Sequence, residues 1–254
     1  MNLIVSSIKG GVGKTTVTVG LAKAFQKSGL RVGILDLDYR SPSVHLLLAS
    51  NHVELQHGPG DSLVPPVVDG IAVFSTGYIW PPDKAVMMED DLAVEDVKQL
   101  IVPGAIAWPE LDILVVDSPP TSSGIVLAAL EMPGLTGVVT VTQASTLSRA
   151  AFLRTLDLFA ECRIPVYAVI CNQSVDENGK QRFDLSVADI EAIASESHIP
   201  VFVSIPHTDK RDSYFDNLVL KLSAVQPVVL PRKEPEDRAW KKLVELSHKL
   251  TKPT

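Results

Sequence analysis

Short apolar runs rich in Val, Ile and Leu recur along the whole chain. Most of them are apolar at every position instead of alternating with polar residues, which is typical of strands covered on both faces of a parallel sheet. The predicted strands are Leu3–Ser7, Arg31–Asp36, Ile71–Ser75, Ile113–Asp117, Val138–Thr142, Val166–Cys171 and Val201–Ser204. The pattern therefore predicts about seven strands in a mainly parallel sheet.

Helical patterns lie between these runs. In Thr15–Ser28, the apolar residues Leu21, Ala22 and Phe25 share one face, and Gly29 is a natural helix stop. The other predicted helices are Thr146–Glu161, Asp189–Ser197 and Pro235–Leu250. Alternation of strands and helices predicts an α/β fold with one doubly wound sheet flanked by helices. We interpret residues 1–254 as a single domain, because no linker or repeat divides them.

Two segments interrupt this alternation. Asn51–Asp69 is polar and rich in Gly, Pro and His, and we interpret it as a long surface loop. Gly77–Asp91 mixes apolar residues with acids. Long loops in compact domains are usually functional or disordered, so the role of both segments stays open.

Composition narrows the class of protein. Hydrophobic residues make up 46% of the chain and charged residues 21%, which excludes a disordered or fibrous protein. The net charge of −7 does not favour a nucleic-acid partner, because such proteins usually carry a basic surface. The two cysteines cannot form a disulfide framework.

No segment has the pattern of a targeting or membrane signal. Met1–Ile8 is too short for the apolar core of a signal peptide. The longest uncharged stretches, Ser118–Leu130 and Met132–Ser148, contain Pro, Gly, Ser and Thr and fall short of a bilayer span. We therefore expect a soluble, cytoplasmic protein.

A glycine-rich octet follows the first predicted strand and opens the first predicted helix. Its residues are Lys9, Gly10, Gly11, Val12, Gly13, Lys14, Thr15 and Thr16. Glycines let backbone N–H groups turn toward phosphate oxygens, and the helix N-terminus adds partial positive charge. Lys14 is predicted to contact the β- and γ-phosphates, and the Thr15 hydroxyl to coordinate Mg²⁺. Ile8 stands where the strict G-x-x-x-x-G-K-S/T pattern has its first glycine.

Acidic residues end two of the predicted strands. Asp36 and Asp38 stand at the end of the second strand, and Asp117 ends the run Ile113–Asp117. At the carboxyl edge of a parallel sheet, Asp36 and Asp38 can turn toward a metal and a γ-phosphate, and Asp117 can hold Mg²⁺ through water. The alternative for Asp36 and Asp38 is a helix-capping or loop carboxylate.

The octet KGGVGKTT resembles the deviant Walker A motif of the MinD/ParA/Mrp family of P-loop ATPases. This resemblance implies a P-loop NTPase fold, Mg²⁺ and ATP as cofactors, ATP hydrolysis and an ATP-dependent homodimer. It also implies that Lys9 reaches the nucleotide of the other subunit, that Asp38 positions the attacking water and that Asp36 orders the Mg²⁺ hydration shell. A solvated loop lysine is the alternative for Lys9.

The same resemblance assigns the base-binding end of the site. Asn172 follows a late predicted strand and matches the family's adenine-binding Asn. Pro206 and His207 match a second loop that faces the base. Ordinary turn residues are the alternative for all three.

Two further stretches are similar to the Mrp branch of this family. Asp36–Ser43 (DLDYRSPS) is similar to its D-x-D-x-x-G-P-S stretch, with Ser41 in place of glycine. Asp117–Gly124 (DSPPTSSG) is similar to its D-x-P-P-G-T-G-D stretch. The resemblance implies an accessory ATPase in metallocofactor maturation, for iron–sulfur or nickel enzymes, with an unidentified protein client.

The chain lacks the C-x-x-C pair with which Mrp-type scaffolds commonly bridge an iron–sulfur cluster. Its only cysteines, Cys162 and Cys171, favour core positions, so we do not expect an iron–sulfur cluster. Three histidines, His45, His52 and His57, match no compact nickel motif, and we interpret them as loop residues. Mg²⁺ is the metal that we predict, and whether the protein binds any other metal stays open.

Two other functions within the family stay open. A ParA-type partitioning ATPase would bind DNA through a basic surface, which the net charge does not favour. A MinD-type protein would use a C-terminal amphipathic helix on a membrane, and Trp240–Leu250 has an apolar stripe. We expect that helix to pack on the domain instead, because Ser247 interrupts the stripe and Glu245 the basic face. Neither nucleic acid nor membrane is an expected partner.

Overall fold

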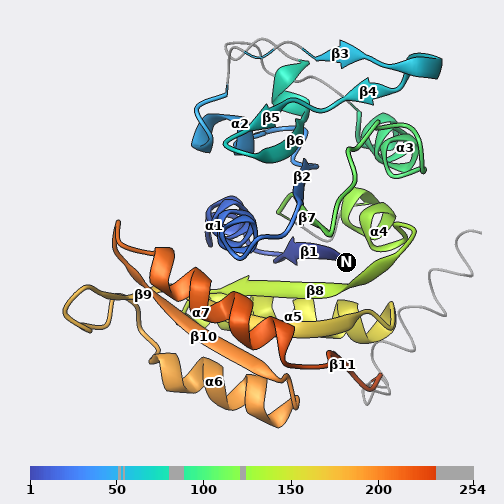
Figure 1. The fold of residues 1–254 in the computed structure, drawn as a ribbon. Coiled ribbons are helices and arrows are strands. Elements are labelled where there is room, and N and C mark those ends of the chain that lie inside the picture. Colours follow the sequence, from blue (N-terminus) through green and yellow to red (C-terminus); the bar gives the residue numbers. More distant parts are fainter. Residues whose placement is uncertain (51–52, 54, 80–88, 121–123, 233–254) are drawn as a thin grey trace, which may run out of the picture.

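A nine-stranded sheet forms the centre of the molecule in the computed structural model, which describes residues 1–50, 53, 55–79, 89–120 and 124–232 (Figure 1). Its strand order is β10-β9-β8-β1-β7-β2-β6-β5, with β11 paired to β9. The seven parallel strands are β1 (Asn2–Ser6), β2 (Val32–Asp36), β6 (Ile71–Ser75), β7 (Ile113–Asp117), β8 (Leu135–Thr142), β9 (Pro165–Asp176) and β10 (Val201–His207). These are the seven predicted strands, so the predicted fold class is confirmed.

Two short antiparallel strands extend the sheet beyond this prediction. β5 (Val67–Val68) pairs with β6, and β11 (Val228–Val229) pairs with β9. A separate hairpin joins β3 (Gln56–His57) to β4 (Leu63–Val64), with the 3₁₀ turn η1 (Pro59–Asp61) between them. The prediction of one long loop at Asn51–Asp69 is therefore wrong at β3, η1, β4 and β5. Two-residue strands lack the periodicity by which a sequence pattern reveals a strand.

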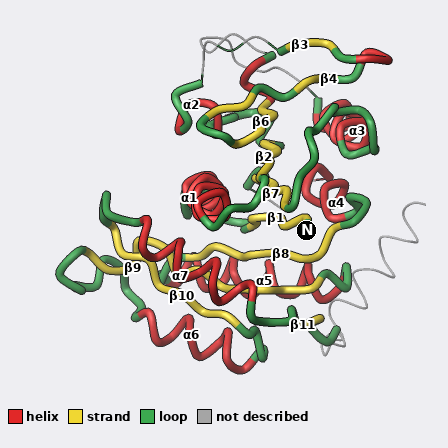
Figure 2. The backbone as a smooth tube through the Cα atoms, in the orientation of Figure 1, coloured by secondary structure: helices red, strands yellow, loops and turns green. Residues whose placement is uncertain are grey.

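Helices cover both faces of the sheet and create two apolar cores (Figures 1 and 2). On one face lie α1 (Lys14–Lys27), α2 (Val44–Leu47) and α7 (Asp212–Ser223). On the other face lie α3 (Asp90–Leu100), α4 (Gly124–Leu130), α5 (Thr146–Glu161) and α6 (Val187–Glu196). The parallel strands are buried on both faces, which is why their sequences are apolar throughout.

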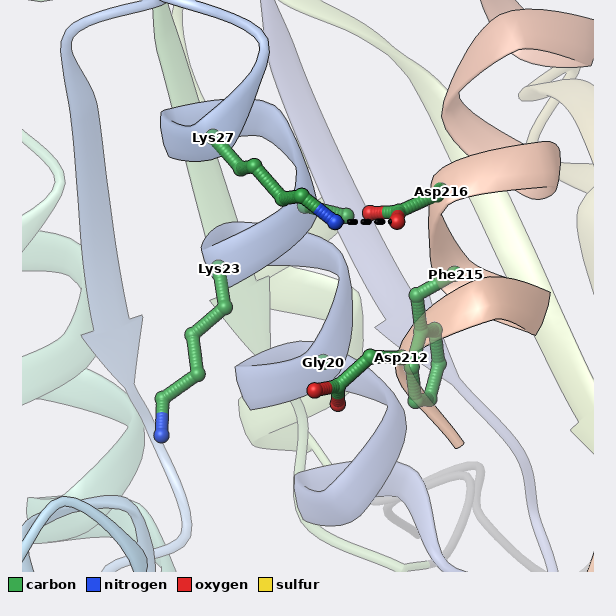
Figure 3. Close-up of a pocket in the computed structure, with 7 residues that line it drawn as sticks. Gly20, Lys23, Lys27, Asp212, Phe215 and Asp216 are labelled. Atoms are coloured by element: carbon green, nitrogen blue, oxygen red, sulfur yellow. Dashed lines mark hydrogen bonds and ion pairs between the residues drawn. The ribbon is translucent and has the colours of Figure 1, made fainter. Parts of the chain in front are cut away.

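Helices α1 and α7 pack closely beside the sheet (Figure 3). The ring of Phe215 lies against Gly20, where a Cβ atom would collide with it. Around this contact is a small cavity of about 80 Å³, and at its rim the Lys27 ammonium pairs with the Asp216 carboxylate at 2.5 Å. The contact fixes α1, the helix that carries the glycine-rich octet at its N-terminus.

The predicted helices differ from the observed ones in number more than in position. α1, α5 and α6 match predicted helices within two residues at each end, whereas Pro235–Leu250 lies outside the described residues. α7 was not predicted, although Phe215, Leu218, Val219 and Leu222 are buried at helical spacing. α4 is short and apolar along most of its length, so its period does not distinguish helix from strand. Among the described residues, no helix is long and apolar enough to cross a membrane.

The C-terminal ends of β1, β2 and β7 lie along the same border of the sheet, in its middle. There the direction in which successive strands are added to the sheet reverses. From β1 the chain continues to β2 and β6 on one side, and from β7 to β8 and β9 on the other. Ligands in open α/β sheets bind in the crevice at such a reversal. The glycine-rich octet and the three predicted acids all stand at this edge.

Candidate functional site

The loop between β1 and α1, residues 7–13, is called the P-loop below. Gly11 and Gly13 have φ angles of 73° and 92°, in the left-handed region that favours glycine. Gly13 is the N-cap of α1, and no side chain caps this helix end. The N–H groups of its first turn are therefore available to a bound anion.

Side chains from distant elements hold the P-loop in this shape. The Asn172 amide Nδ2 donates to the Val12 carbonyl oxygen at 2.8 Å, and it lies so close to Gly13 that a Cβ there would collide with it. The Ile8 N–H donates to the Thr155 hydroxyl of α5 at 3.2 Å. The loop is thus anchored at both ends before any ligand binds, which lowers the entropy cost of binding.

Lys14 is the buried cation of the site. Its residue is 7% exposed, and burial lowers the pKa of its ammonium group while the carboxylates of Asp117 and Asp38 raise it. The two acids thus offset part of the cost of burying the ammonium group. The structure therefore brings together three residues that were predicted to share the site. Lys9, in contrast, is half-buried in the P-loop, where its N–H donates to the Ser7 hydroxyl at 3.3 Å.

Asp117, at the end of β7, is 1% exposed and hydrogen-bonded to helix α1. The hydroxyls of Thr15 and Thr18 both donate to its carboxylate, from Thr18 at 3.0 Å. Burial and the neighbouring Asp36, its register partner on β2, raise the pKa of Asp117 well above the usual range. Sequence reasoning missed Thr18, although it stands one helical turn after Lys14 and so on the same face of α1.

Asp36 is fully buried and accepts hydrogen bonds from four donors. Oδ1 accepts from the Asp38 N–H at 3.1 Å, and Oδ2 from the N–H groups of Ser43 and Val44 at 3.2 Å each and from the Ser75 hydroxyl at 2.9 Å. The carboxylate thereby caps the N-terminus of α2, which is the alternative considered for it above. Burial raises its pKa to about 6.

Asp38 lies half-buried in the loop that follows β2. Its Oδ1 accepts from the Ser41 N–H at 3.1 Å, and its carboxylate also accepts from the Arg40 N–H. Burial raises the pKa of Asp38, while these hydrogen bonds and the nearby Lys14 ammonium lower it. An ionised carboxylate has about four lone-pair sites, so Asp38 retains acceptor capacity beyond these two hydrogen bonds.

The predicted base-binding residues lie on two adjacent strands. Asn172 in β9 is the register neighbour of Ile205 in β10, and Pro206 and His207 follow directly. Asn172 is 1% exposed, and its amide group contacts the P-loop backbone. Pro206 is buried and His207 exposed. The structure places all three near the P-loop edge of the sheet.

The donor set at this edge fits Mg²⁺. Thr15 and Asp117 are in contact, and Asp36 stands opposite Asp117 on the neighbouring strand. Among the described residues at this border, the buried carboxylates of Asp36 and Asp117 outnumber the one buried ammonium group, that of Lys14. In the described part of the chain, no group of three or more His, Cys, Asp or Glu side chains has the arrangement of a metal cage. Mg²⁺ does not need one, because it keeps much of its water and binds through one or two protein oxygens plus phosphate.

The cysteines and histidines are dispersed. Cys162 is exposed at the end of α5, and Cys171 is buried in β9, where its Sγ lies 3.1 Å from the Ser174 hydroxyl. Burial raises the pKa of both thiols. His45 is buried, His57 is exposed, and His52 lies outside the described residues. His45 is therefore not the loop residue that the sequence suggested, because it belongs to helix α2 and is buried.

The family follows from a comparison of the whole chain with protein-family models. The model described as ParA, NUBPL iron-transfer P-loop NTPase, matches residues 1–242. The chain belongs to this family. It is thus a P-loop NTPase of the Mrp/MinD/ParA type, as the octet predicted.

Two curated relatives carry the same name. The iron-sulfur cluster carrier protein of Haemophilus influenzae is 29% identical over 255 residues, which cover 98% of this chain and 65% of the relative. The protein of the same name from Escherichia coli is 29% identical over 92% of this chain and 62% of its own length. The chain therefore spans less than two thirds of the length of these relatives.

Solved structures share the fold. A nucleotide-binding protein from Archaeoglobus fulgidus in complex with ADP has a TM-score of 0.69 and 25% identity, covering 87% of each chain. The septum site-determining protein MinD from Pyrococcus horikoshii, complexed with Mg-ADP, has a TM-score of 0.58 and 17% identity over 99% of this chain and 96% of its own. This second similarity shows the fold alone.

One expectation is corrected by the relatives. The missing C-x-x-C pair led us to expect no iron–sulfur cluster, yet the relatives are named iron-sulfur cluster carrier proteins. The expectation was wrong because it treated one local cysteine motif as a requirement for cluster chemistry. A ligand set assembled from separate chains does not require a C-x-x-C pair in each of them.

Proposed function

We propose that this protein is a Mg-ATP-binding, ATP-hydrolysing switch that dimerises around its nucleotide. The observation that carries the proposal is the buried Lys14 between Asp38 and Asp117, directly beside an uncapped helix N-terminus. Phosphate oxygens would accept from the P-loop N–H groups, Gly10 to Gly13, and from Lys14, Thr15 and Thr16 at the start of α1. Asn172, Pro206 and His207 would surround the base.

The Mg²⁺ ion, when bound, would neutralise charge that builds up on the β- and γ-phosphates. Thr15 would hold the ion directly, and Asp36 and Asp117 would accept hydrogen bonds from its water shell. The hydrogen bond from Thr18 orients Asp117 for this role. These residues need no movement of the sheet, because β2 and β7 place both carboxylates in register.

Asp38 would orient the attacking water by accepting its hydrogen bond. Its carboxylate is suited to this role, because it has lone pairs beyond those that accept from the N–H groups of Ser41 and Arg40. Lys9 would act on the nucleotide of a second copy, where its ammonium group would stabilise charge on the transferred phosphoryl group. Hydrolysis would then require the dimer, which makes the nucleotide state a switch.

For the biological role we propose an accessory ATPase in metallocofactor maturation, with an iron–sulfur cluster as the cargo suggested by the names of the relatives. The two cysteines of one chain do not supply a cluster's usual four thiolates. A client protein or a second copy would complete the ligand set. Anaerobic reconstitution with iron and sulfide, followed by iron analysis with and without ATP and client, tests this role. Failure of the chain to bind or transfer a cluster under every condition would contradict it.

A matched pair of variants tests the enzymatic part of the proposal. Thr15→Ser keeps the hydroxyl group that would hold Mg²⁺, and Thr15→Ala removes it. We expect the Ser variant to release phosphate from ATP within about 3-fold of the wild-type rate, and the Ala variant to lose about 100-fold. Equal rates in the two variants would contradict the role of Thr15, and no Mg²⁺-dependent hydrolysis by the wild type would contradict the ATPase itself.

A further inference from the structure

A buried chain of hydrogen bonds leads away from Asp36 toward α2. The Ser75 hydroxyl, at the end of β6, lies 2.9 Å from Asp36 Oδ2 and 3.3 Å from Nδ1 of His45. Ser75 is fully buried, and His45 is 4% exposed. Neither residue belongs to the P-loop or to the acids that the sequence predicted.

The direction of these hydrogen bonds follows from the number of protons available. A serine hydroxyl has one proton and two lone pairs. The ionised Asp36 carboxylate can only accept, so it takes the Ser75 proton. The Gly77 N–H donates to Ser75 Oγ at 3.2 Å and occupies one lone pair. The second lone pair then accepts from His45, which must carry its proton on Nδ1.

Surrounding residues fix the His45 ring in this position. A Cβ atom at Gly77 would collide with the ring, so the backbone of residue 77 lies directly against it. Tyr78 packs edge-on, with ring centroids 5.7 Å apart. The Tyr78 hydroxyl lies 2.7 Å from the Ser50 hydroxyl, and Ser50 donates through its N–H to the His45 carbonyl oxygen at 2.8 Å.

Asp36 connects these hydrogen bonds to the loop that holds Asp38. The same carboxylate accepts from the N–H groups of Asp38, Ser43 and Val44. We propose that Ser75 and His45 are positioning residues for ATP hydrolysis, which act through Asp36 to hold residues 38–44 in the geometry that Asp38 needs. This inference rests on the proposed ATPase function and adds two residues to its machinery.

A matched pair of variants at His45 tests the proposal. His45→Asn places an amide donor near the position of Nδ1, whereas His45→Leu has a similar shape and cannot donate. Both lose the ring contact with Tyr78, so their difference isolates the hydrogen bond to Ser75. We expect His45→Leu to lower kcat for ATP hydrolysis about 5-fold relative to His45→Asn, with KM for ATP within about 2-fold.

Tyr78, which packs on the His45 ring, provides a control variant. Tyr78→Phe removes the hydroxyl group but leaves the ring beside His45, and it should keep kcat within about 2-fold of wild type. Equal kcat values in His45→Leu and His45→Asn, with active wild type, would overturn the inference while leaving the ATPase intact. An inactive wild type would instead count against the proposed function.

Hydrogen exchange tests the positioning role without any activity. The N–H groups of Asp38, Ser43 and Val44 should exchange faster in His45→Leu than in His45→Asn, because Asp36 loses an oriented donor. If both variants unfold, the pair Ser75→Ala and Ser75→Thr is compared by the same measurement, since Thr keeps the hydroxyl. Exchange that is unchanged by loss of the donor would overturn the inference.

Discussion

Two loops at the same edge of the sheet prepare the candidate site in different ways. The P-loop follows β1, and its shape comes from glycines at positive φ and from an uncapped helix end. The loop of residues 37–43 follows β2, and one buried carboxylate, Asp36, organises it through three backbone N–H groups. The first loop offers its backbone to a ligand, whereas the second uses its backbone to hold a side chain, Asp38, in place.

The difference suggests a division of labour between binding and hydrolysis. Backbone N–H groups contact the phosphates of both ATP and ADP, so damage to the backbone shape of the P-loop should affect binding. The loop of residues 37–43 presents Asp38 to the reacting water, so damage there should affect kcat. The predictions below test this division, from the largest expected effect to the smallest.

Removal of the buried cation should have the largest effect on binding. In Lys14→Ala, Asp38 and Asp117 lose their attractive partner and the phosphates lose a charged donor. We expect the affinity for Mg-ATP to fall about 100-fold or more, measured by calorimetry. Circular dichroism of the variant controls for folding. Binding at the wild-type affinity in a folded variant would remove Lys14 from the site.

Asp38→Ala tests the role of the loop of residues 37–43 in hydrolysis. Because the Asp38 carboxylate interacts with Lys14 through charge, and is not itself a phosphate-binding group, ATP should still bind within about 3-fold. We expect kcat to fall about 100-fold, since the attacking water loses its acceptor. With ATP present, the variant should accumulate as a dimer in light scattering. Loss of ATP binding instead would mean that both loops serve binding.

An intermediate effect is expected at the contact that anchors the P-loop. Asn172→Asp keeps the shape of the side chain but cannot donate to the Val12 carbonyl oxygen. The charge repels that oxygen, so the loop loses part of its fixed shape. We expect about a 10-fold weaker affinity for both ATP and ADP, with kcat at saturating ATP within about 3-fold. A large fall in kcat alone would contradict a purely binding role for this contact.

The smallest effect is expected from loss of the exposed ion pair between α1 and α7. Lys27 and Asp216 form an exposed ion pair that joins α1 to α7, far along the helix from the P-loop (Figure 3). Lys27→Met should change Tm by less than about 2 °C, because exposed ion pairs contribute little. ATP affinity and kcat should match wild type. A change in either would show that α1 transmits strain to the P-loop.

The same two loops explain what could be predicted from the sequence. Seven parallel strands and the P-loop have local signals, since apolar runs and glycines near Lys14 specify backbone shape over a few residues. For Asp36, helix capping was only the alternative to a metal role, because its contacts with Ser75 and with residues 43–44 at the start of α2 are connected by no local pattern. His45 looked like a loop histidine for the same reason. Contacts between residues far apart in sequence stay hidden until the fold is known.

The cluster expectation failed in a related way. A C-x-x-C pair is a local signal, and its absence removes only one of the ways in which a chain can take part in iron–sulfur chemistry. The names of the relatives carried information that the two cysteines, Cys162 and Cys171, did not.

Calorimetric titration of the wild-type protein with ATP tests whether the P-loop, Lys14 and the neighbouring acids form a nucleotide site. We expect one ATP bound per chain in the presence of Mg²⁺, and a markedly weaker affinity after chelation with EDTA, because Thr15 and Asp117 would then lose the ion that links them to the phosphates. Repeating the titration with Lys14→Ala assigns the heat to this site. Absence of binding by the folded wild type, with and without Mg²⁺, would contradict the account.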